Sequence, residues 1–283
     1  MYDILLRHIQ KNYEILPLVK IGNKGGSCRF CKSSKASYRN KSHSIPELLG
    51  NKSIFTLDEC DECNKYFGRK IERDLSEFVT PSWFTKLKGK NGRRTMQALG
   101  GIKLSSDVSS LNIEFPDHSS NYFKDIILET KGRSFAGVNV YKAWVKILVS
   151  ILPEKYLSDF DDTTKWLLSD DGFEKLNHRP FILVGNQLPD FRLPDVMDVE
   201  LIRQQNAGED AVYQLDVRFN NYYIKLPFSP KAKCMFRVGE VIPARNEIEK
   251  VYFQEIDLSK YVSKHNYKLK LDTEGSPHKS AIA

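Results

Sequence analysis

The sequence predicts a fold of the α+β class, with a small cysteine-containing domain followed by a larger α+β domain built on a mainly antiparallel sheet. Three observations support this division. Two Cys-x-x-Cys pairs precede an amphipathic segment that runs from Asp61 to Val79. After Pro180, short apolar runs separated by turn residues are typical of antiparallel strands. A basic, glycine-containing segment at residues 86–101 separates the two regions.

Composition indicates a globular protein that does not cross a membrane. Of the 283 residues, 41% are hydrophobic and 28% are charged, values close to the average for soluble domains. The longest apolar run, from Trp144 to Leu152, is interrupted by Lys146 and Ser150, and a span needs about 18 apolar residues. The N-terminus carries Asp3 and has no adequate apolar core for a secretory signal. We therefore expect a cytoplasmic protein.

The first residues have a weakly helical spacing of apolar side chains. Residues 2–14 are accordingly predicted to form a helix, with His8 on its surface. Three glycines between residues 22 and 26 then break the chain ahead of the first cysteine pair.

The two cysteine pairs indicate one structural zinc ion, with Cys28, Cys31, Cys60 and Cys63 as its ligands. Each pair makes a knuckle whose two thiolates can reach a single ion, and closed zinc sites take four such ligands. Unrelated thiol pairs or disulfides are the alternative. Zinc-bound thiols suit a reducing compartment, and the remaining Cys234 is expected to be a small buried residue.

A hairpin and a helix are predicted inside and after the cysteine pairs. Beyond His43, a turn region around Pro46 and Gly50 leads to a return strand at residues 54–57. The helix is expected from Asp61 to Val79, where Pro81 stops it. Its apolar stripe is predicted at Phe67, Ile71, Leu75 and Phe78, and Gly68 is expected to mark close backbone packing.

The segment from His43 to Asn51 (HSIPELLGN), followed by Cys60-Asp-Glu-Cys-Asn64, resembles the HNH endonuclease family in its zinc-clipped ββα-metal branch. The resemblance covers about residues 25 to 80. It implies a hairpin that carries a catalytic histidine, a helix after it, and a divalent metal between the two. At the matching positions it implies His43 as the general base, Asn64 as a ligand of a catalytic Mg²⁺ or Mn²⁺ ion, and the four cysteines as zinc ligands.

These residue types suit phosphodiester hydrolysis. A neutral imidazole, with an ordinary pKa of about 6.5, can remove a proton from water at physiological pH. A hard cation offsets the charge that builds up in the transition state. Because Mg²⁺ keeps several waters, one or two protein oxygens can hold it.

The segment departs from the family pattern at two positions. Ser42 stands where an acidic metal ligand is usual, and the usual middle asparagine falls near Phe55 or Thr56. The nearby oxygen donors that could complete the metal site are Asn51, Asp58 and Glu59.

Basic residues concentrate in the first part of the chain. The formal net charge is +7, and residues 1–100 hold 19 Lys/Arg against 10 Asp/Glu, a net charge of +9, so the remainder carries −2. Nucleic acid is the partner that this footprint favours over a merely solvated surface. The charge does not distinguish DNA from RNA, and double-stranded DNA is the partner that we expect. The residues predicted to bind it are Lys35, Arg39, Lys41, Arg69, Lys88, Lys90, Arg93 and Arg94.

We place the domain boundary in the glycine-containing segment. The expected organisation is an HNH domain at residues 1–85, a linker at 86–101, an α+β domain at 102–271 and a disordered tail at 272–283. In the third part, helices are predicted at residues 141–152 and 154–168. Strands are predicted at residues 102–104, 111–115, 122–128, 181–184, 196–203, 211–219, 222–227, 234–238 and 250–256, with a hairpin turn at 220–221.

Two functions from different classes are consistent with these features. The first is a metal-dependent endonuclease acting on DNA, with a role in bacterial defence or restriction. The second is a catalytically inactive, zinc-containing nucleic-acid-binding protein, which Ser42 and the missing middle asparagine favour. In either case residues 102–271 are candidates for sensing, targeting, homodimer formation or contact with an activating partner, by analogy with nuclease effectors.

Overall fold

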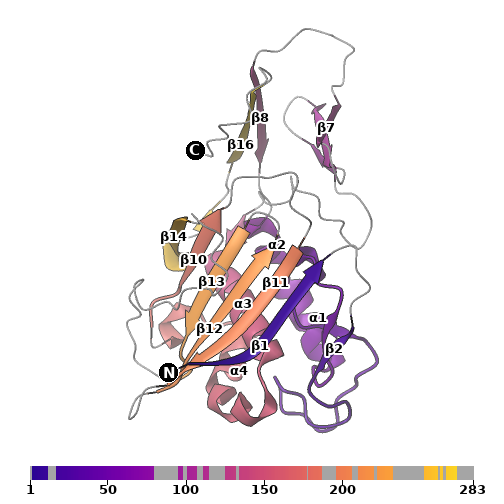
Figure 1. The fold of residues 1–283 in the computed structure, drawn as a ribbon, viewed down its shortest axis with the longest axis vertical. Coiled ribbons are helices and arrows are strands. Elements are labelled where there is room, and N and C mark those ends of the chain that lie inside the picture. The colour runs from indigo at the N-terminus through magenta and orange to yellow at the C-terminus, as the bar shows by residue number, and fades with distance from the viewer. Residues whose placement is uncertain are drawn as a thin grey trace.

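The computed structural model describes residues 2–11, 17–79, 95–97, 101–106, 111–114, 125–131, 134–176, 178–186, 196–205, 210–219, 222–231, 252–260, 262–263 and 266–272. The predicted α+β class is confirmed. Helices cover one face of a six-stranded antiparallel sheet (Figure 1). The strands of this sheet are, in spatial order, β1 (Tyr2–Lys11), β11 (Val196–Gln204), β12 (Val212–Phe219), β13 (Tyr222–Phe228), β10 (Phe181–Asn186) and β14 (Tyr252–Asp257).

The helical layer contains α1 (Asp61–Lys70), α2 (Glu72–Phe78), α3 (Gly137–Ile151) and α4 (Asp161–Leu168). Short 3₁₀ turns accompany it: η1 (Glu47–Leu49), η4 (Glu154–Phe160), η5 (Phe173–Lys175) and η7 (Leu258–Lys260). No helix among the described residues has both the length and the apolar character needed to span a membrane.

The described residues also form four smaller sheets. One joins β2 (Val19–Ile21), β4 (Ile54–Thr56) and β3 (Ser42–His43), and a second joins β5 (Thr95–Gln97), β6 (Lys103–Ser106) and β7 (Leu111–Glu114). Two pairs are formed by β16 (Asn266–Asp272) with β8 (Asp125–Lys131), and by β15 (Val262–Ser263) with β9 (Phe135–Ala136).

The helix predicted for residues 2–14 is wrong, because residues 2–11 form strand β1 at the edge of the large sheet, paired with β11. The register shifts between Ile4 and Leu6, which places an irregularity in the strand. Such a bulge breaks the alternation of apolar and polar residues that would reveal a strand, and it leaves three apolar residues in a row that look helical. His8 is half-buried, and its Nε2 lies 2.8 Å from Oγ of Ser53, so it is not a plain surface residue.

The predicted hairpin is confirmed. Strand β3 pairs with β4 in antiparallel fashion, with His43 opposite Phe55. The expected long helix is divided at Ile71 into α1 and α2, but the backbone N–H of Ile71 still donates to the carbonyl of Phe67 (3.0 Å). Phe67, Ile71 and Leu75 are buried, as the apolar stripe predicts.

Gly68 does not mark close packing. It is exposed, and a Cβ added there would meet no atom within 4 Å. The end of the helix at Pro81 lies outside the described residues.

Helix α3 is the centre of the molecule. Every residue from Val140 to Ile151 is buried, so the helix is enclosed on all sides and not only on the single apolar face that the sequence suggested. It lies between the large sheet and the helices that follow the cysteines (Figure 1). One continuous buried cluster contains Phe67 and Leu75 from the first region and Trp144 and Leu148 from α3.

The predicted boundary region is also structured in part. Residues 95–97, inside the expected linker, form strand β5 and pair with β6. Strand β1, which the sequence analysis assigned to the first domain, is hydrogen-bonded to β11 of the second. The strands expected at 181–184, 196–203, 211–219, 222–227 and 250–256 correspond to β10 through β14, whereas residues 234–238 and the tail from 273 lie outside the described residues.

Candidate metal centre and active site

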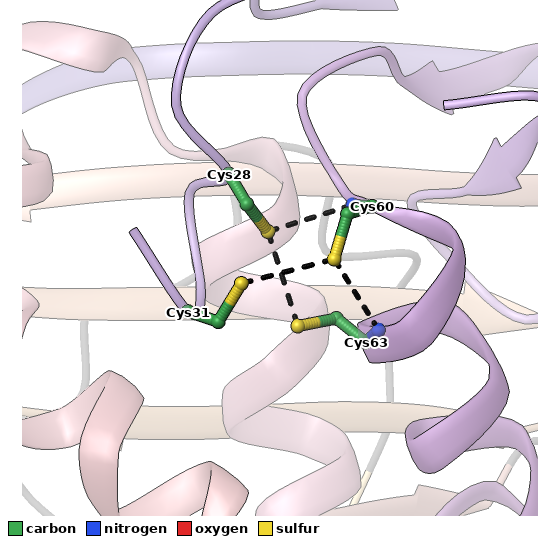
Figure 2. Close-up of side chains that lie close together, drawn as sticks. All are labelled: Cys28, Cys31, Cys60 and Cys63. Atoms are coloured by element: carbon green, nitrogen blue, oxygen red, sulfur yellow. Dashed lines mark hydrogen bonds between the residues drawn. The ribbon is translucent and has the colours of Figure 1, made fainter. Parts of the chain in front are cut away.

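The four cysteines come together at one point (Figure 2). Their sulfur atoms all lie within 4.8 Å of one another. The Sγ atoms of Cys28 and Cys63 are 3.9 Å apart, and those of Cys31 and Cys60 are 3.8 Å apart. A tetrahedral zinc ion with Zn–S bonds of about 2.3 Å requires sulfur separations of about 3.8 Å. The residues therefore fit a structural zinc ion, and none of the four cysteines is part of a disulfide in the structure.

Local structure positions each thiol. Cys60 is the N-cap of α1 and Cys63 lies in its first turn, so the start of this helix forms the second knuckle. The backbone N–H groups of Cys60 and Cys63 donate to Sγ of Cys28 and of Cys60, each at 3.5 Å. In the first knuckle, Lys32 adopts a φ of 60°, a left-handed conformation that the tight turn after Cys31 requires.

The electrostatics of the cluster favour a bound cation. The hydrogen bond from Cys63 lowers the pKa of the Cys28 thiol to about 4. Burial raises the pKa of Cys60 to about 11, and the neighbouring Cys28 sulfur raises the pKa of Cys63. Four thiols at this spacing therefore cannot all ionise by themselves, whereas a doubly charged ion removes the conflict between them.

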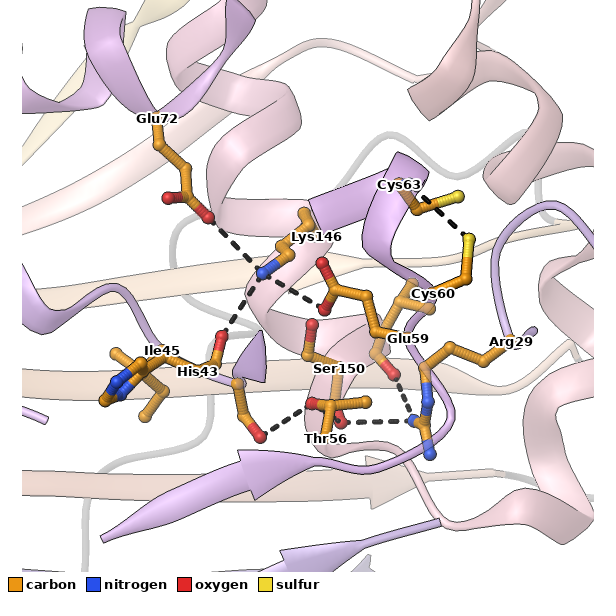
Figure 3. A network of polar contacts seen from close by, with 12 residues as sticks. Arg29, His43, Ile45, Thr56, Glu59, Cys60, Cys63, Glu72, Lys146 and Ser150 are labelled. Atoms are coloured by element: carbon orange, nitrogen blue, oxygen red, sulfur yellow. Dashed lines mark hydrogen bonds and ion pairs between the residues drawn. The ribbon is translucent and has the colours of Figure 1, made fainter. Parts of the chain in front are cut away.

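His43 lies on the two-residue strand β3 and is half-buried. Its ring packs against the cross-strand Phe55, with ring centroids 4.7 Å apart, and the ammonium of Lys41 lies 5.9 Å from the same phenyl ring. The imidazole points away from the buried charges behind the hairpin (Figure 3). The hairpin thus presents an imidazole with a basic side chain close to it.

Asn64 lies in the first turn of α1, directly after Cys63. It is half-buried, and its backbone N–H donates to the carbonyl of Cys60 (2.9 Å). Because Cys60 and Cys63 lie at the start of this helix, the position of the cysteine cluster also determines where Asn64 lies.

The other three oxygen donors considered for the metal site are engaged elsewhere. Asn51 closes the hairpin turn: its Nδ2 donates to the carbonyls of Ile45 and Ile54, and its Oδ1 accepts from the N–H groups of Ser53 and Ile54. Asp58 binds the guanidinium of Arg29 through both carboxylate oxygens, at 2.6 and 3.1 Å.

The third donor, Glu59, is fully buried, and its Oε2 lies 3.4 Å from Nζ of Lys146. Burial raises the pKa of Glu59, although Lys146 acts in the opposite direction. Among the described residues, the four cysteines are the one group of three or more cysteine, histidine or acidic side chains close enough to hold a metal ion. Asn51, Asp58 and Glu59 therefore all make contacts that hold the fold together.

Side chains of the first region complete both ends of helix α3. The N-cap residue Ala136 offers no side-chain cap, and the first and last turns contain no acidic and no basic residue, respectively. Asp74 of α2 supplies the missing acceptor, since its Oδ2 accepts from the N–H of Ala136 (3.0 Å) and from Nδ2 of Asn139 (2.8 Å). An acid at the N-terminus of a helix interacts favourably with its dipole.

At the C-terminus of α3, Arg29 supplies hydrogen-bond donors for the last carbonyls. This residue lies between the first two cysteines. Its Nη1 donates to the carbonyls of Val149 (2.8 Å), Ser150 (3.1 Å) and Leu152 (3.2 Å). The knuckle that carries two zinc ligands therefore also satisfies the last carbonyls of the central helix. Gly22, at a φ of +73°, leaves room for Asp58, the acid that pairs with Arg29. A Cβ at position 22 would collide with the Asp58 carboxylate.

Strand β1 holds the hairpin turn from the other side. The buried side chain of Gln10 donates to the carbonyl of Gly50 (2.6 Å) and accepts from the N–H of Lys52 (2.9 Å) and from Oγ of Ser53 (2.8 Å). No local sequence pattern marks Gln10, Arg29 or Asp74 as supports of the site, and Lys146 stood out only as an interruption of an apolar run. The one available signal was the presence of charged residues within the apolar run of α3.

Within residues 17–79, the fold leaves most basic side chains exposed and covers most acidic ones at least in part. Of the eight acidic residues, one is exposed, Glu62, whereas eleven lysines and arginines are exposed. Three acids are buried in contacts with Arg29, Lys146 and the N-terminus of α3. The exposed charge is consequently far more positive than the composition indicates.

The predicted nucleic-acid-binding residues divide into two groups. Those within the described residues are all exposed: Lys35, Arg39, Lys41 and Arg69. The others lie outside the described residues: Lys88, Lys90, Arg93 and Arg94.

The four clustered cysteines, the hairpin with its histidine and the following helix are the arrangement expected of a zinc-clipped domain of the ββα-metal class. Comparison with protein families identifies this segment: residues 28–79 match the family described as HNH endonuclease. The match spans 52 of the 283 residues and supports a nuclease-type function with a nucleic-acid substrate. No curated protein and no solved structure shows a significant match to the chain.

Proposed function

We propose that this protein is a metal-dependent endonuclease that hydrolyses phosphodiester bonds in DNA. The observation that carries the proposal is the placement of His43 on a hairpin beside a zinc-clipped helix that bears Asn64.

In the proposed reaction, His43 accepts a proton from the attacking water molecule. The phosphate is held by exposed lysine and arginine side chains near the hairpin, among them Lys41 and Arg39. Asn64 would hold a Mg²⁺ or Mn²⁺ ion, which when bound supplies charge stabilisation at the scissile phosphate.

The remaining assignments also belong to the proposal. The substrate is double-stranded DNA, the compartment is the cytoplasm, and the biological role is bacterial defence or restriction. Residues 102–271 serve sensing, targeting or oligomerisation, and the boundary at residues 86–101 separates them from the nuclease domain.

Replacement of the base tests the proposal directly. With purified full-length protein and plasmid DNA, His43→Ala should lower Mg²⁺- or Mn²⁺-dependent cleavage at least about a hundredfold, the usual contribution of a general base. EDTA should abolish the wild-type activity. His8→Ala, which changes a histidine outside the hairpin, should retain most of it. Cutting that persists in His43→Ala would show that another group is the base.

The second candidate function is a zinc-containing nucleic-acid-binding protein without catalysis. Ser42 and the engagement of Asn51, Asp58 and Glu59 in holding the fold favour this candidate. It is supported if the wild-type protein binds DNA but does not cut it, whichever metal and whichever candidate activator is added.

Removal of exposed charges near the hairpin should weaken DNA binding without changing sequence preference. Arg39→Ala and Lys41→Ala should each reduce the slope of log affinity against log salt concentration by about one, because each removes one phosphate contact. Fluorescence anisotropy of a labelled duplex at several NaCl concentrations measures this slope. Lys165→Ala is the matched control, since Lys165 is equally exposed but lies on α4 beside Asp162. Equal slopes for all three variants would show that the DNA-binding surface does not include Arg39 and Lys41.

A further inference from the structure

Helix α3 buries a lysine that the reaction proposed above does not use. The side chain of Lys146 is 1% exposed, and its Nζ lies 3.4 Å from Oε2 of Glu59 and 3.3 Å from Oε1 of Glu72. The same ammonium donates to the main-chain carbonyl of His43, also at 3.3 Å (Figure 3). Two of its N–H groups therefore serve the hydrogen bonds to His43 and Glu72, and the Glu59 carboxylate forms an ion pair beside them.

Packing alone does not explain a charge at this position. The neighbouring residues of α3 are buried, and most of them are apolar. An apolar side chain of similar size would avoid the desolvation of an ammonium group. Burial opposes the charge on Lys146, but Glu59 and Glu72 outweigh it and raise the pKa of this side chain. The lysine therefore remains a cation. Because a buried charge contributes little to the stability of the fold, the groups that it contacts indicate its role.

The contact with His43 involves its backbone and not its ring. Figure 3 shows the imidazole directed away from the ammonium, while the carbonyl of the same residue points toward it. A bond to this carbonyl fixes the peptide plane between His43 and Ser44. Side-chain rotamers are defined relative to the backbone, so the orientation of that plane sets the direction in which the imidazole projects.

Strand β3 leaves this orientation sensitive to an outside contact. It has two residues and pairs with β4 alone, whereas Lys146 belongs to an enclosed helix of 15 residues. The carboxylates that share the ammonium come from the segment before Cys60 and from α2. One lysine thus joins the hairpin, the zinc-clipped segment and the helix after it to α3.

We propose that Lys146 is a positioning residue for His43, through which helix α3 holds the hairpin in its reactive orientation. This inference rests on the proposed nuclease function. It makes cleavage depend on the docking of α3, an element outside the segment of residues 28–79 that matches the HNH family.

The test compares three variants of the full-length protein. Lys146→Met removes the ammonium, and Lys146→Met with Glu59→Gln also removes the acid that would be left buried without its cation. Lys142→Met is the matched control: Lys142 is one turn earlier on α3 and equally buried, and it donates to the carbonyl of Ser169 (2.8 Å). We expect the double variant to keep its zinc and its thermal midpoint near the wild-type value. Its kcat should nevertheless fall about ten- to hundredfold, with KM within about twofold, because misplacement of a reacting group acts on the chemical step.

A second readout does not depend on activity. The ring signals of the six histidines can be followed by NMR, with His43→Ala providing the assignment. The signal of His43 should shift or broaden in the double variant and stay in place in Lys142→Met. A wild-type kcat together with an unshifted His43 signal in the double variant would overturn the proposal. If the wild-type protein does not cut DNA, the proposed function fails, and the NMR comparison still decides whether Lys146 positions His43.

Discussion

Removal of zinc is expected to unfold the segment of residues 28–79 and to loosen helix α3 with it. Zinc binding to four thiolates contributes about 10–16 kcal/mol at neutral pH, which is as large as the entire stability of an ordinary domain. A segment of this size seldom folds without such a staple. The buried side chains of this segment, such as Phe30 and Phe67, whose ring centroids are 4.8 Å apart, belong to the same cluster as those of α3, so a loss of order in the segment should reach that helix.

Helix α3 should respond because Arg29 and Asp74 cap its two ends. Tryptophan fluorescence reports this response, since Trp144 lies on α3 and Trp166 on α4. A strong chelator should release one zinc ion per chain and change this fluorescence in the same concentration range. Cys63→Ser should lower the thermal midpoint by about 10 °C or more. Cys234→Ser, outside the two pairs, should retain its zinc, and loss of zinc there would contradict the assignment of the four ligands.

Arg29→Met is expected to destabilise the protein by about 3–5 kcal/mol even with zinc bound. It leaves the buried carboxylate of Asp58 without its partner, and removal of one member of a buried ion pair has this cost. It also leaves the carbonyls of Val149, Ser150 and Leu152 without the donor that ends α3. Arg29→Lys should not restore the loss, because a single ammonium cannot bind both carboxylate oxygens and three carbonyls in the geometry of a guanidinium.

Urea unfolding in the presence of zinc measures this difference. The matched control is Lys32→Met, three residues away, which removes an exposed ion pair to Asp161 whose side chains are 45% and 54% exposed. Such a pair contributes less than about 1 kcal/mol. Similar losses for Arg29→Met and Lys32→Met would mean that the Arg29 contacts do not support α3.

The zinc clip and the hairpin could be predicted from sequence because their information is local. The four ligands lie within 36 consecutive residues, and the spacing within each pair dictates the knuckle geometry. The return strand at residues 54–56 and the buried stripe of Phe67, Ile71 and Leu75 likewise follow from short-range periodicity. The positions of His43 and Asn64 relative to the cysteines come from the same short stretch.

Other features depended on partners that are distant in sequence. Strand β1 was not predicted, because its bulge conceals the alternation and its pairing partner, β11, begins at residue 196. The exposure of Gly68 likewise depends on what packs around its helix, which the sequence of the helix does not contain. Tertiary context overrides local propensity in such cases.

The sequence by itself determined the class of site: four thiolates for zinc, and an imidazole and an amide in fixed order around them. Only the tertiary structure decided which charges face solvent, and which side chain contacts the backbone of His43. Asp58, Glu59 and Asp74 looked like free acids in the sequence, but Arg29, Lys146 and the N-terminus of α3 bury them. The physical reason is that a buried charge must find its partner in space, and for Glu59 and Asp74 that partner, helix α3, lies more than 60 residues further along the chain.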